Sequence, residues 1–355
     1  MVLNPAAQQA FSFISGATPA TTPPAPAPAP TPAHQSPSPS PQPTSSSKPQ
    51  PSSNSSSPSA APSQTVPAPA APATDNKDAK VPTSKIDDTR VGLSLELITK
   101  VDRHTPALQL AYSTESDYES FGLALKDAID FNKKNTTLLL GVAGSHDIVK
   151  ASSLASHENK DTIDVMVGLT QVISPTTLFT ANLTLGHVEG YLADPYKVVE
   201  LNGVLVPEKR PDSKDKTIAY LSLTQFFNQL NGSLEASFRW YNDTYGITSE
   251  TCTLAWYQNL GRFFILAPSF RLYDQTAADF YAYRFSGSPD YYSSDYRVSA
   301  LRAYGYGLKL IWKPNDRFAV DVAVERYEQE GKDSETPDDA YPAAMVFTGG
   351  ARIWF

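Results

Sequence analysis

Charged side chains recur in this sequence on one side of segments whose other side is apolar. Within residues 232–244, Glu235 and Arg239 alternate with Phe238 and Trp240. Because successive side chains of a strand point to opposite faces, such charges share one polar face. That face could line an aqueous passage and screen solutes by charge, or its charges could pair with one another and hold the wall together. The alternation assigns these residues to it: Glu96, Lys126, Asp164, Glu235, Arg239, Asp243, Arg271, Lys309, Asp321, Glu325 and Arg352.

Catalytic and metal-binding patterns are absent from the sequence. It has no HExxH, no P-loop, no GxSxG elbow and no strand–GxGxxG–helix unit. The single Cys252 excludes an intramolecular disulfide framework and a multi-thiolate metal site. The five histidines show no ligand spacing, and the net charge of -8 argues against nucleic acid as a partner. We therefore expect no enzyme activity, no metal and no cofactor.

The elements that must position these charges are strands. Thirteen alternating segments follow residue 86, and no stretch has the roughly 18 consecutive apolar residues of a membrane helix. Most of the segments exceed the 9–11 residues that cross a bilayer at a tilt, whereas soluble strands are about 5–6 residues long. Short turns such as "NKKN" alternate with long polar loops, among them 190–215 and 276–294. This pattern favours a transmembrane antiparallel β-barrel, an all-β fold with short periplasmic turns and longer outer loops.

The N-terminal part has a different composition. Residues 16–85 are rich in Pro, Ser and Ala, a composition that predicts a disordered low-complexity segment. The last strand should run toward the periplasm, because it follows a long outer loop, and strand directions alternate along the chain. Counting back through thirteen strands then places the tract at the outer end of the barrel, as an outer loop, with residues 1–15 as the remnant of a preceding strand. The sequence thus predicts three parts: a strand remnant in 1–15, a loop in 16–85 and the barrel in 86–355. The visible barrel would have about fourteen strands, an even number, as in single-chain bacterial barrels.

The aromatic residues gather near the ends of the segments. Tyr241, Tyr257 and Tyr273 are among those that we assign to girdles at the two membrane interfaces. The loop sequence "DQTAADFYAYRFSGSPDYYSSDY" instead interleaves Tyr with Asp and could bind a sugar or another outer ligand. Cys252 shares a face with Leu254 and Trp256, so we expect it to face lipid.

Several stretches resemble a known family. "STESDYES", "NKKNTTLLLGV", "GYLADPYKVV" and "FRWYNDTYGITSE" look like the Gram-negative outer-membrane barrel family catalogued as domain of unknown function 3570, over residues 11–19 and roughly 85–355. The resemblance implies a bacterial outer-membrane location. It also implies a signal peptide and a further hairpin upstream, hence a sixteen-stranded barrel of which this chain is an N-terminally truncated form. The alternating C-terminal strand, with Phe347, Ile353 and Phe355, is similar to the signal that hands such proteins to the barrel assembly machinery.

The family has no assigned activity, so function must be argued from the residues. We expect a porin-like channel that passes small solutes. The alternatives are a surface structural or ligand-binding barrel with a plugged lumen and an outer-membrane enzyme, for which the sequence shows no Ser–His pair with an orienting acid. Outer-membrane lipid, the barrel assembly machinery and an unidentified small solute are the expected partners. The sequence pattern identifies neither the solute nor the oligomeric state.

Overall fold

The computed structural model describes residues 90–151 and 153–354. The predictions for residues 1–15, for residues 16–85 and for Phe355 therefore lie outside the described residues. Within that part of the chain, no helix has the length and apolar character needed to cross a membrane.

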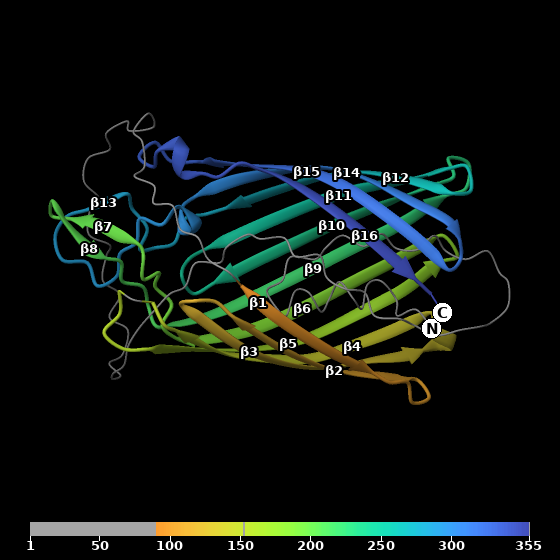
Figure 1. Cartoon of the computed structure of the whole chain (residues 1–355), viewed down its shortest axis with the longest axis horizontal. Coiled ribbons are helices and arrows are strands. Elements are labelled where there is room, and N and C mark those ends of the chain that lie inside the picture. Colours follow the sequence, from red (N-terminus) through yellow and green to blue (C-terminus); the bar gives the residue numbers. More distant parts are fainter. Residues whose placement is uncertain (1–89, 152, 355) are drawn as a thin grey trace.

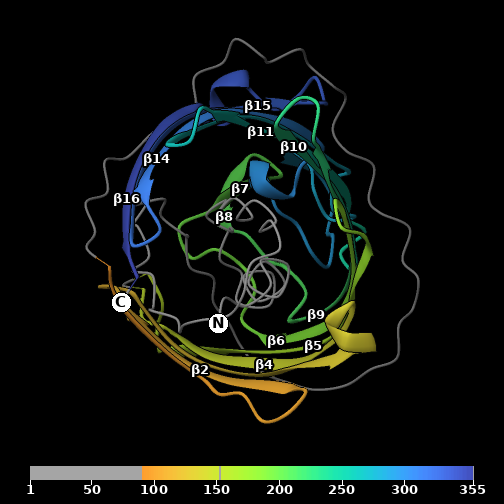
Figure 2. The same ribbon diagram turned by 90° about the vertical axis from the view of Figure 1, so that its right-hand side faces the viewer.

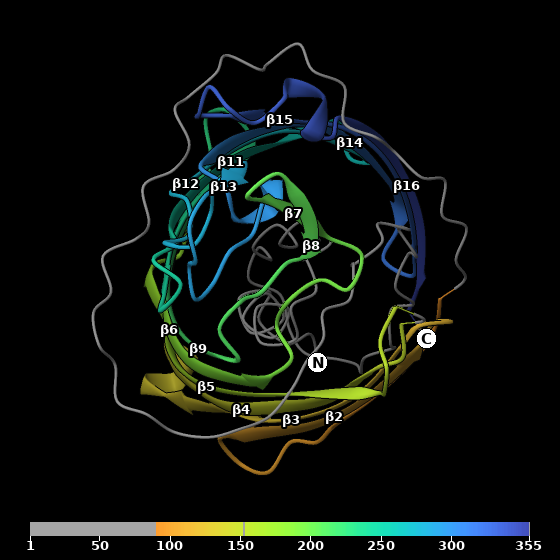
Figure 3. The same cartoon turned by 90° about the vertical axis from the view of Figure 1, so that its left-hand side faces the viewer.

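The main element is a sheet of 13 antiparallel strands. It confirms the predicted all-β class and the thirteen segments predicted after residue 86. Consecutive strands along the chain are neighbours in the sheet, which curls into a ring so that its end strands approach each other (Figures 2 and 3). The strands are β1 (Val91–Ile98), β2 (His104–Thr114), β3 (Tyr118–Phe131), β4 (Thr136–Val149), β5 (Glu158–Ser174), β6 (Thr177–Gly190), β9 (Ser213–Phe227), β10 (Gly232–Asp243), β11 (Thr248–Leu260), β12 (Phe264–Gln275), β14 (Leu301–Asn315), β15 (Phe318–Gly331) and β16 (Ala344–Ile353).

The outside of the barrel is apolar. Along β5, Ile163, Val165, Val167 and Leu169 are exposed, whereas the alternate residues, such as Met166, are buried. The same alternation holds on β16, where Phe347 is 75% exposed. Exposed apolar side chains on neighbouring strands form a continuous band that water would not solvate favourably, so the band contacts hydrocarbon. The chain is thus a transmembrane β-barrel, and barrels of this type are proteins of the bacterial outer membrane.

The two ends of the barrel differ in their connections. At one end, at the right of Figure 1, the turns are short, and the turn Asn132–Lys134 forms the 3-10 helix η1. At the other end lie the long connections 191–212, 276–300 and 332–343 (Figure 1). Since outer-membrane barrels carry their long loops outside the cell, we call this the outer end. β1 begins there, in the direction that the count back from the C-terminus predicts.

The long loops contain secondary structure that we did not predict from the sequence. They contain a second sheet of three strands, β7 (Val198–Leu201), β8 (Val204–Pro207) and β13 (Arg284–Phe285), and the 3-10 helices η2 (Tyr296–Val298) and η3 (Asp338–Ala340). Asn202 and Gly203 have positive φ values of 54° and 78° and form the tight turn between β7 and β8. The loop that we predicted at 276–294 extends further, because residues 295–300 form η2 and a bend and β14 starts at Leu301.

Residues 191–212 and 276–300 together form what we call the cap. β13 pairs with β7 in parallel, which joins the two loops. The small sheet lies across the barrel opening when the molecule is viewed from its outer end (Figure 3). Beneath it, Tyr245, Ile247, Ala278, Phe280 and Val298 form a buried apolar cluster. This cluster gives the cap a small core of its own and attaches it to the turn between β10 and β11.

Candidate functional site

The inner wall of the barrel carries the charges that alternation assigned to the polar face. Each of those residues lies on the side of its strand that faces the lumen, opposite the apolar band. Lys126 Nζ lies 2.7 Å from Glu96 Oε1, and Asp321 lies between Lys309 at 3.9 Å and Arg352 at 3.6 Å. The wall therefore has charges of both signs, several of them paired across strands.

The Asp164–Lys216 pair crosses a whole strand, as the Lys126–Glu96 pair does. Asp164 on β5 and Lys216 on β9 each pair in register with Gly186 on β6, which lies between them. Lys216 Nζ donates to Asp164 Oδ2 at 3.1 Å across β6. A Cβ atom on Gly186 would lie 1.9 Å from Asp164 Oδ1 and 2.3 Å from Lys216 Cε. Glycine at this position is what allows the pair to form. Lys216 was not among the residues predicted for the lumen, although it lies on β9 with the parity of Ile218 and Tyr220.

Substituting Gly186 by alanine should destabilise the barrel by about 1–3 kcal/mol, because the new methyl group must displace the Asp164–Lys216 pair. Urea titration of the protein in lipid vesicles measures this loss. Gly349→Ala is the matched control, since a Cβ at Gly349 meets no atom within 4 Å. Equal stability of the two variants would contradict this account of the pair.

The tyrosines on the inner wall correct one prediction. Tyr241, Tyr257 and Tyr273 point into the lumen, so their assignment to interfacial girdles is wrong. The alternation itself contains the signal, because these residues share the parity of Arg239, Ala255 and Arg271 on their strands. Trp256 does lie outside, near the short turns, and its ring packs against Phe227 with 5.8 Å between centroids. Cys252 is exposed on the same outer face.

The C-terminal strand follows the predicted alternation. Phe347 and Ile353 are exposed on the lipid side of β16, and Arg352 lies on the lumen side, facing Asp321. Phe355 lies outside the described residues.

A buried network of charges joins the two loops of the cap. Asp295, which is 0% exposed, accepts from Arg210 Nη2 at 2.7 Å and from Arg297 Nε at 2.7 and 2.9 Å. Arg297 also contacts Asp194, and Arg210 Nη2 donates to Glu208 at 3.1 Å. Ser293 Oγ donates to the same carboxylate oxygen, Glu208 Oε2, at 2.5 Å. Side chains from both loops thus meet around Asp295.

The three acids of this network differ in proton affinity. Burial alone would raise the pKa of Asp295, but the hydrogen bonds and charge of Arg297, with the charges of Arg210 and Lys197, lower it to about 2. Burial raises the pKa of Glu208 and of Asp194, against the opposing effect of the neighbouring arginines. Asp295 is therefore the acid that most firmly keeps its negative charge between the two arginines.

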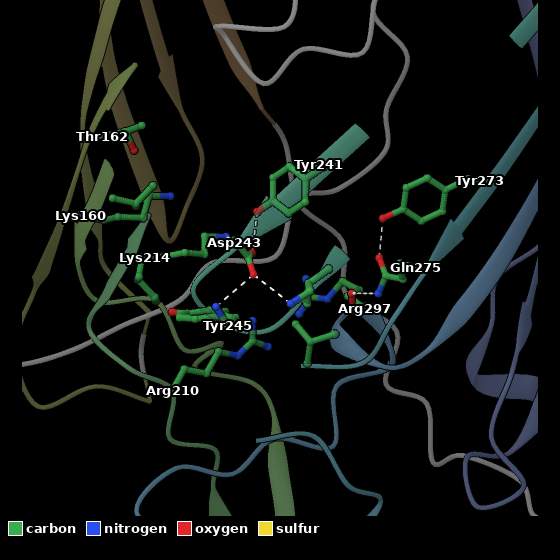
Figure 4. Close-up of a pocket in the computed structure, with 14 residues that line it drawn as sticks. Lys160, Thr162, Arg210, Lys214, Tyr241, Asp243, Tyr245, Tyr273, Gln275 and Arg297 are labelled. Atoms are coloured by element: carbon green, nitrogen blue, oxygen red, sulfur yellow. Dashed lines mark hydrogen bonds and ion pairs between the residues drawn. The ribbon is translucent and has the colours of Figure 1, made fainter. Parts of the chain in front are cut away.

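A cavity of about 440 Å³ lies where the cap meets the inner wall. Figure 4 shows its lining, which comes from β5, β6, β9, β10 and β12, from the turn between β10 and β11, and from both cap loops. Lys160, Arg210, Lys214 and Arg297 supply positive charge, and Tyr241, Tyr245 and Tyr273 supply aromatic rings. Of the predicted residues, only Asp243 reaches this cavity. The others are distributed along the wall.

Sequence reasoning missed the cap and the cations of the cavity. The dipeptide Asn202–Gly203 between apolar residues was a hairpin signal within the loop that we predicted at 190–215. No local signal marks the ion pairs of the network, because Arg210 and Asp295 are 85 residues apart in the chain.

Comparisons with known proteins give a family but no activity. No curated protein matches the sequence. Among solved structures, the siderophore receptor PirA from Pseudomonas aeruginosa aligns with a TM-score of 0.46 and 11% identity, over 74% of this chain and 50% of that one. CdiB from Acinetobacter baumannii gives 0.45 and 12%, over 75% and 54%. OmpT, an outer membrane protein of Vibrio cholerae, gives 0.36 and 9%, over 76% and 96%.

This chain spans about half the length of PirA and of CdiB. At these scores the similarities say nothing about its activity or substrate. A family model described as protein of unknown function (DUF3570) matches residues 4–350. Since that match covers nearly the whole sequence, the chain belongs to the DUF3570 family.

Proposed function

We propose that this barrel is a porin-like channel for small solutes. The inner wall supports the proposal, because charged and polar side chains line it from the short turns to the outer end while the apolar side chains face lipid. A lumen of this polarity suits water and hydrophilic solutes, and its charges can screen them. The cap across the outer opening would then be the first surface that a solute meets.

Planar bilayers test the proposal. The purified full chain should give discrete current steps, because an ion that enters a water-filled lumen avoids the cost of crossing hydrocarbon. A second recording after proteolytic removal of the cap distinguishes a capped channel from a plugged one. No steps in either state would favour the alternative, a ligand-binding barrel whose lumen is closed. That alternative is supported by the ordered cap and its buried core.

Two further parts of the proposal concern chemistry and assembly. We propose that the barrel has no catalytic role, since Lys126 pairs with Glu96 and Lys309 with Asp321 on the inner wall, and Asp243 accepts hydrogen bonds from the backbone of a turn. The apolar side of β16, with Phe347 and Ile353 exposed, supports recognition by the barrel assembly machinery during insertion. Phe355 would be the last residue of that signal.

A further inference from the structure

In the cavity beneath the cap, the side chains of the cations are more exposed than those of the acids that pair with them. The acids that neighbour these cations are buried, with side-chain exposures of 0% for Glu208 and Asp295 and 1% for Asp243. Asp243 is also occupied, because it accepts from the Tyr241 hydroxyl at 2.6 Å and from two backbone N–H groups of the turn that follows. The surface that a solute contacts is therefore positive.

Lys214 is the cation of this cavity with the loosest partner. Its Nζ lies 3.7 Å from Asp243 Oδ2, which is too long for a hydrogen bond, and its side chain is 26% exposed. An ammonium group has three donors, and none of them is used by Asp243. By contrast, Lys160 donates to the Tyr118 hydroxyl at 2.8 Å and pairs with Asp147 at 2.9 Å. Figure 4 shows Lys214 between Lys160 and Arg210, beside Asp243.

Two half-buried aromatic rings, those of Tyr241 and Tyr273, also line the cavity. The hydroxyl of Tyr273 donates to Gln275 at 2.5 Å and that of Tyr241 to Asp243 at 2.6 Å, so the hydrogen bonds of both hydroxyls are made within the protein. The rings themselves remain as the contact surface for a ligand. Arg239 precedes Tyr241 by two residues on β10, and Arg271 precedes Tyr273 by two residues on β12. Both arginines therefore lie on the same face as these tyrosines but further into the barrel, where they extend the positive surface.

We propose that this cavity is a binding site for a small organic anion, one that carries a carboxylate group and a flat ring. The carboxylate accepts charge-assisted hydrogen bonds from Lys214 and its neighbouring cations, and the ring packs on the tyrosines. The cavity volume of about 440 Å³ accommodates a molecule of one or two rings. The inference deepens the proposed function, because it names the class of solute that a channel of this kind would select.

Binding in detergent micelles tests the site without requiring conduction. Calorimetric titration of the purified full chain compares benzoate with benzamide, its neutral isostere, and with acetate, its ringless counterpart. Benzoate should bind more tightly than either, because only benzoate satisfies both the cations and the rings. If benzamide or acetate binds as tightly as benzoate, the proposal is overturned.

Matched variants locate the site. Lys214→Gln should weaken benzoate binding about tenfold, the loss of one charge-assisted hydrogen bond. Lys209→Gln removes the same charge from an exposed position of the cap loop that leads into β9, outside the cavity lining, and should leave the affinity unchanged. Circular dichroism of each variant checks that the barrel is folded. Equal weakening by both variants, or by neither in folded protein, contradicts the site.

The two proposals fail separately. Charge-dependent benzoate binding in a protein that gives no current steps would retain the site and remove the channel. Current steps in a protein that binds benzoate no better than benzamide would retain the channel and remove the site.

Discussion

Replacing Asp295 by asparagine is expected to release the cap from the barrel mouth. The substitution preserves the size of the side chain but removes the charge shared by Arg210 and Arg297. Those arginines would remain partly buried with too little opposite charge, and breaking a buried pair in this way costs about 3–5 kcal/mol. The loss should fall on the cap rather than on the strands, because the network joins loop to loop.

Hydrogen exchange followed by mass spectrometry measures the effect directly. In Asp295→Asn, peptides from 191–212 and 276–300 should exchange faster, while peptides from β4 and β5 remain protected. Glu200→Gln is the control in the same cap. Arg284 Nε lies 3.1 Å from Glu200 Oε2, and both side chains are 43% exposed. Breaking this exposed ion pair should therefore lower the stability of the cap by at most about 1 kcal/mol. If both variants exchange alike, the buried network does not hold the cap.

A single arginine on the lipid side should have the second large effect. Val165 is 54% exposed near the middle of β5, within the apolar band. If that band contacts hydrocarbon, Val165→Arg places a charge near the bilayer midplane at a cost of about 2–4 kcal/mol. Urea titration of folding into lipid vesicles, followed by tryptophan fluorescence, gives the difference in free energy from the wild type.

Val204 provides the matched control. It is 61% exposed, comparably to Val165, but it lies on β8 in the cap, outside the band. Val204→Arg should change the free energy of folding by no more than about 0.5 kcal/mol, as for a surface substitution in water. Comparable costs for the two valines would mean that the exterior of the strands does not lie in hydrocarbon.

The barrel was predictable because its physical requirement is local and repeated. Each strand must present an apolar side to lipid, so a period of two marks Ile163, Val165 and Val167 without any knowledge of their neighbours. The same period placed Asp164 and Arg352 inside. It failed for Tyr241, Tyr257 and Tyr273 because we gave residue type more weight than parity: a tyrosine suits an interface equally well inside or outside.

The cap was not predictable from the same pattern. Its short strands pair with each other and with β13, far along the chain, and its charges find partners 85 and 103 residues away. Such contacts depend on where the barrel brings the loop ends together, which no local period encodes. The cavity could not be predicted for the same reason. Its cations come from separate elements, Arg210 and Arg297 from the two cap loops and Lys160 and Lys214 from the wall.

The outward position of Cys252 has a practical consequence. The sequence has one cysteine, and its thiol is exposed on the apolar side of β11. A nitroxide or fluorophore attached to this thiol would label the wild-type chain at one site, with no engineered cysteine and no competing position. Quenchers placed at different depths of the bilayer would then read how far β11 is immersed, so the native protein carries its own depth marker.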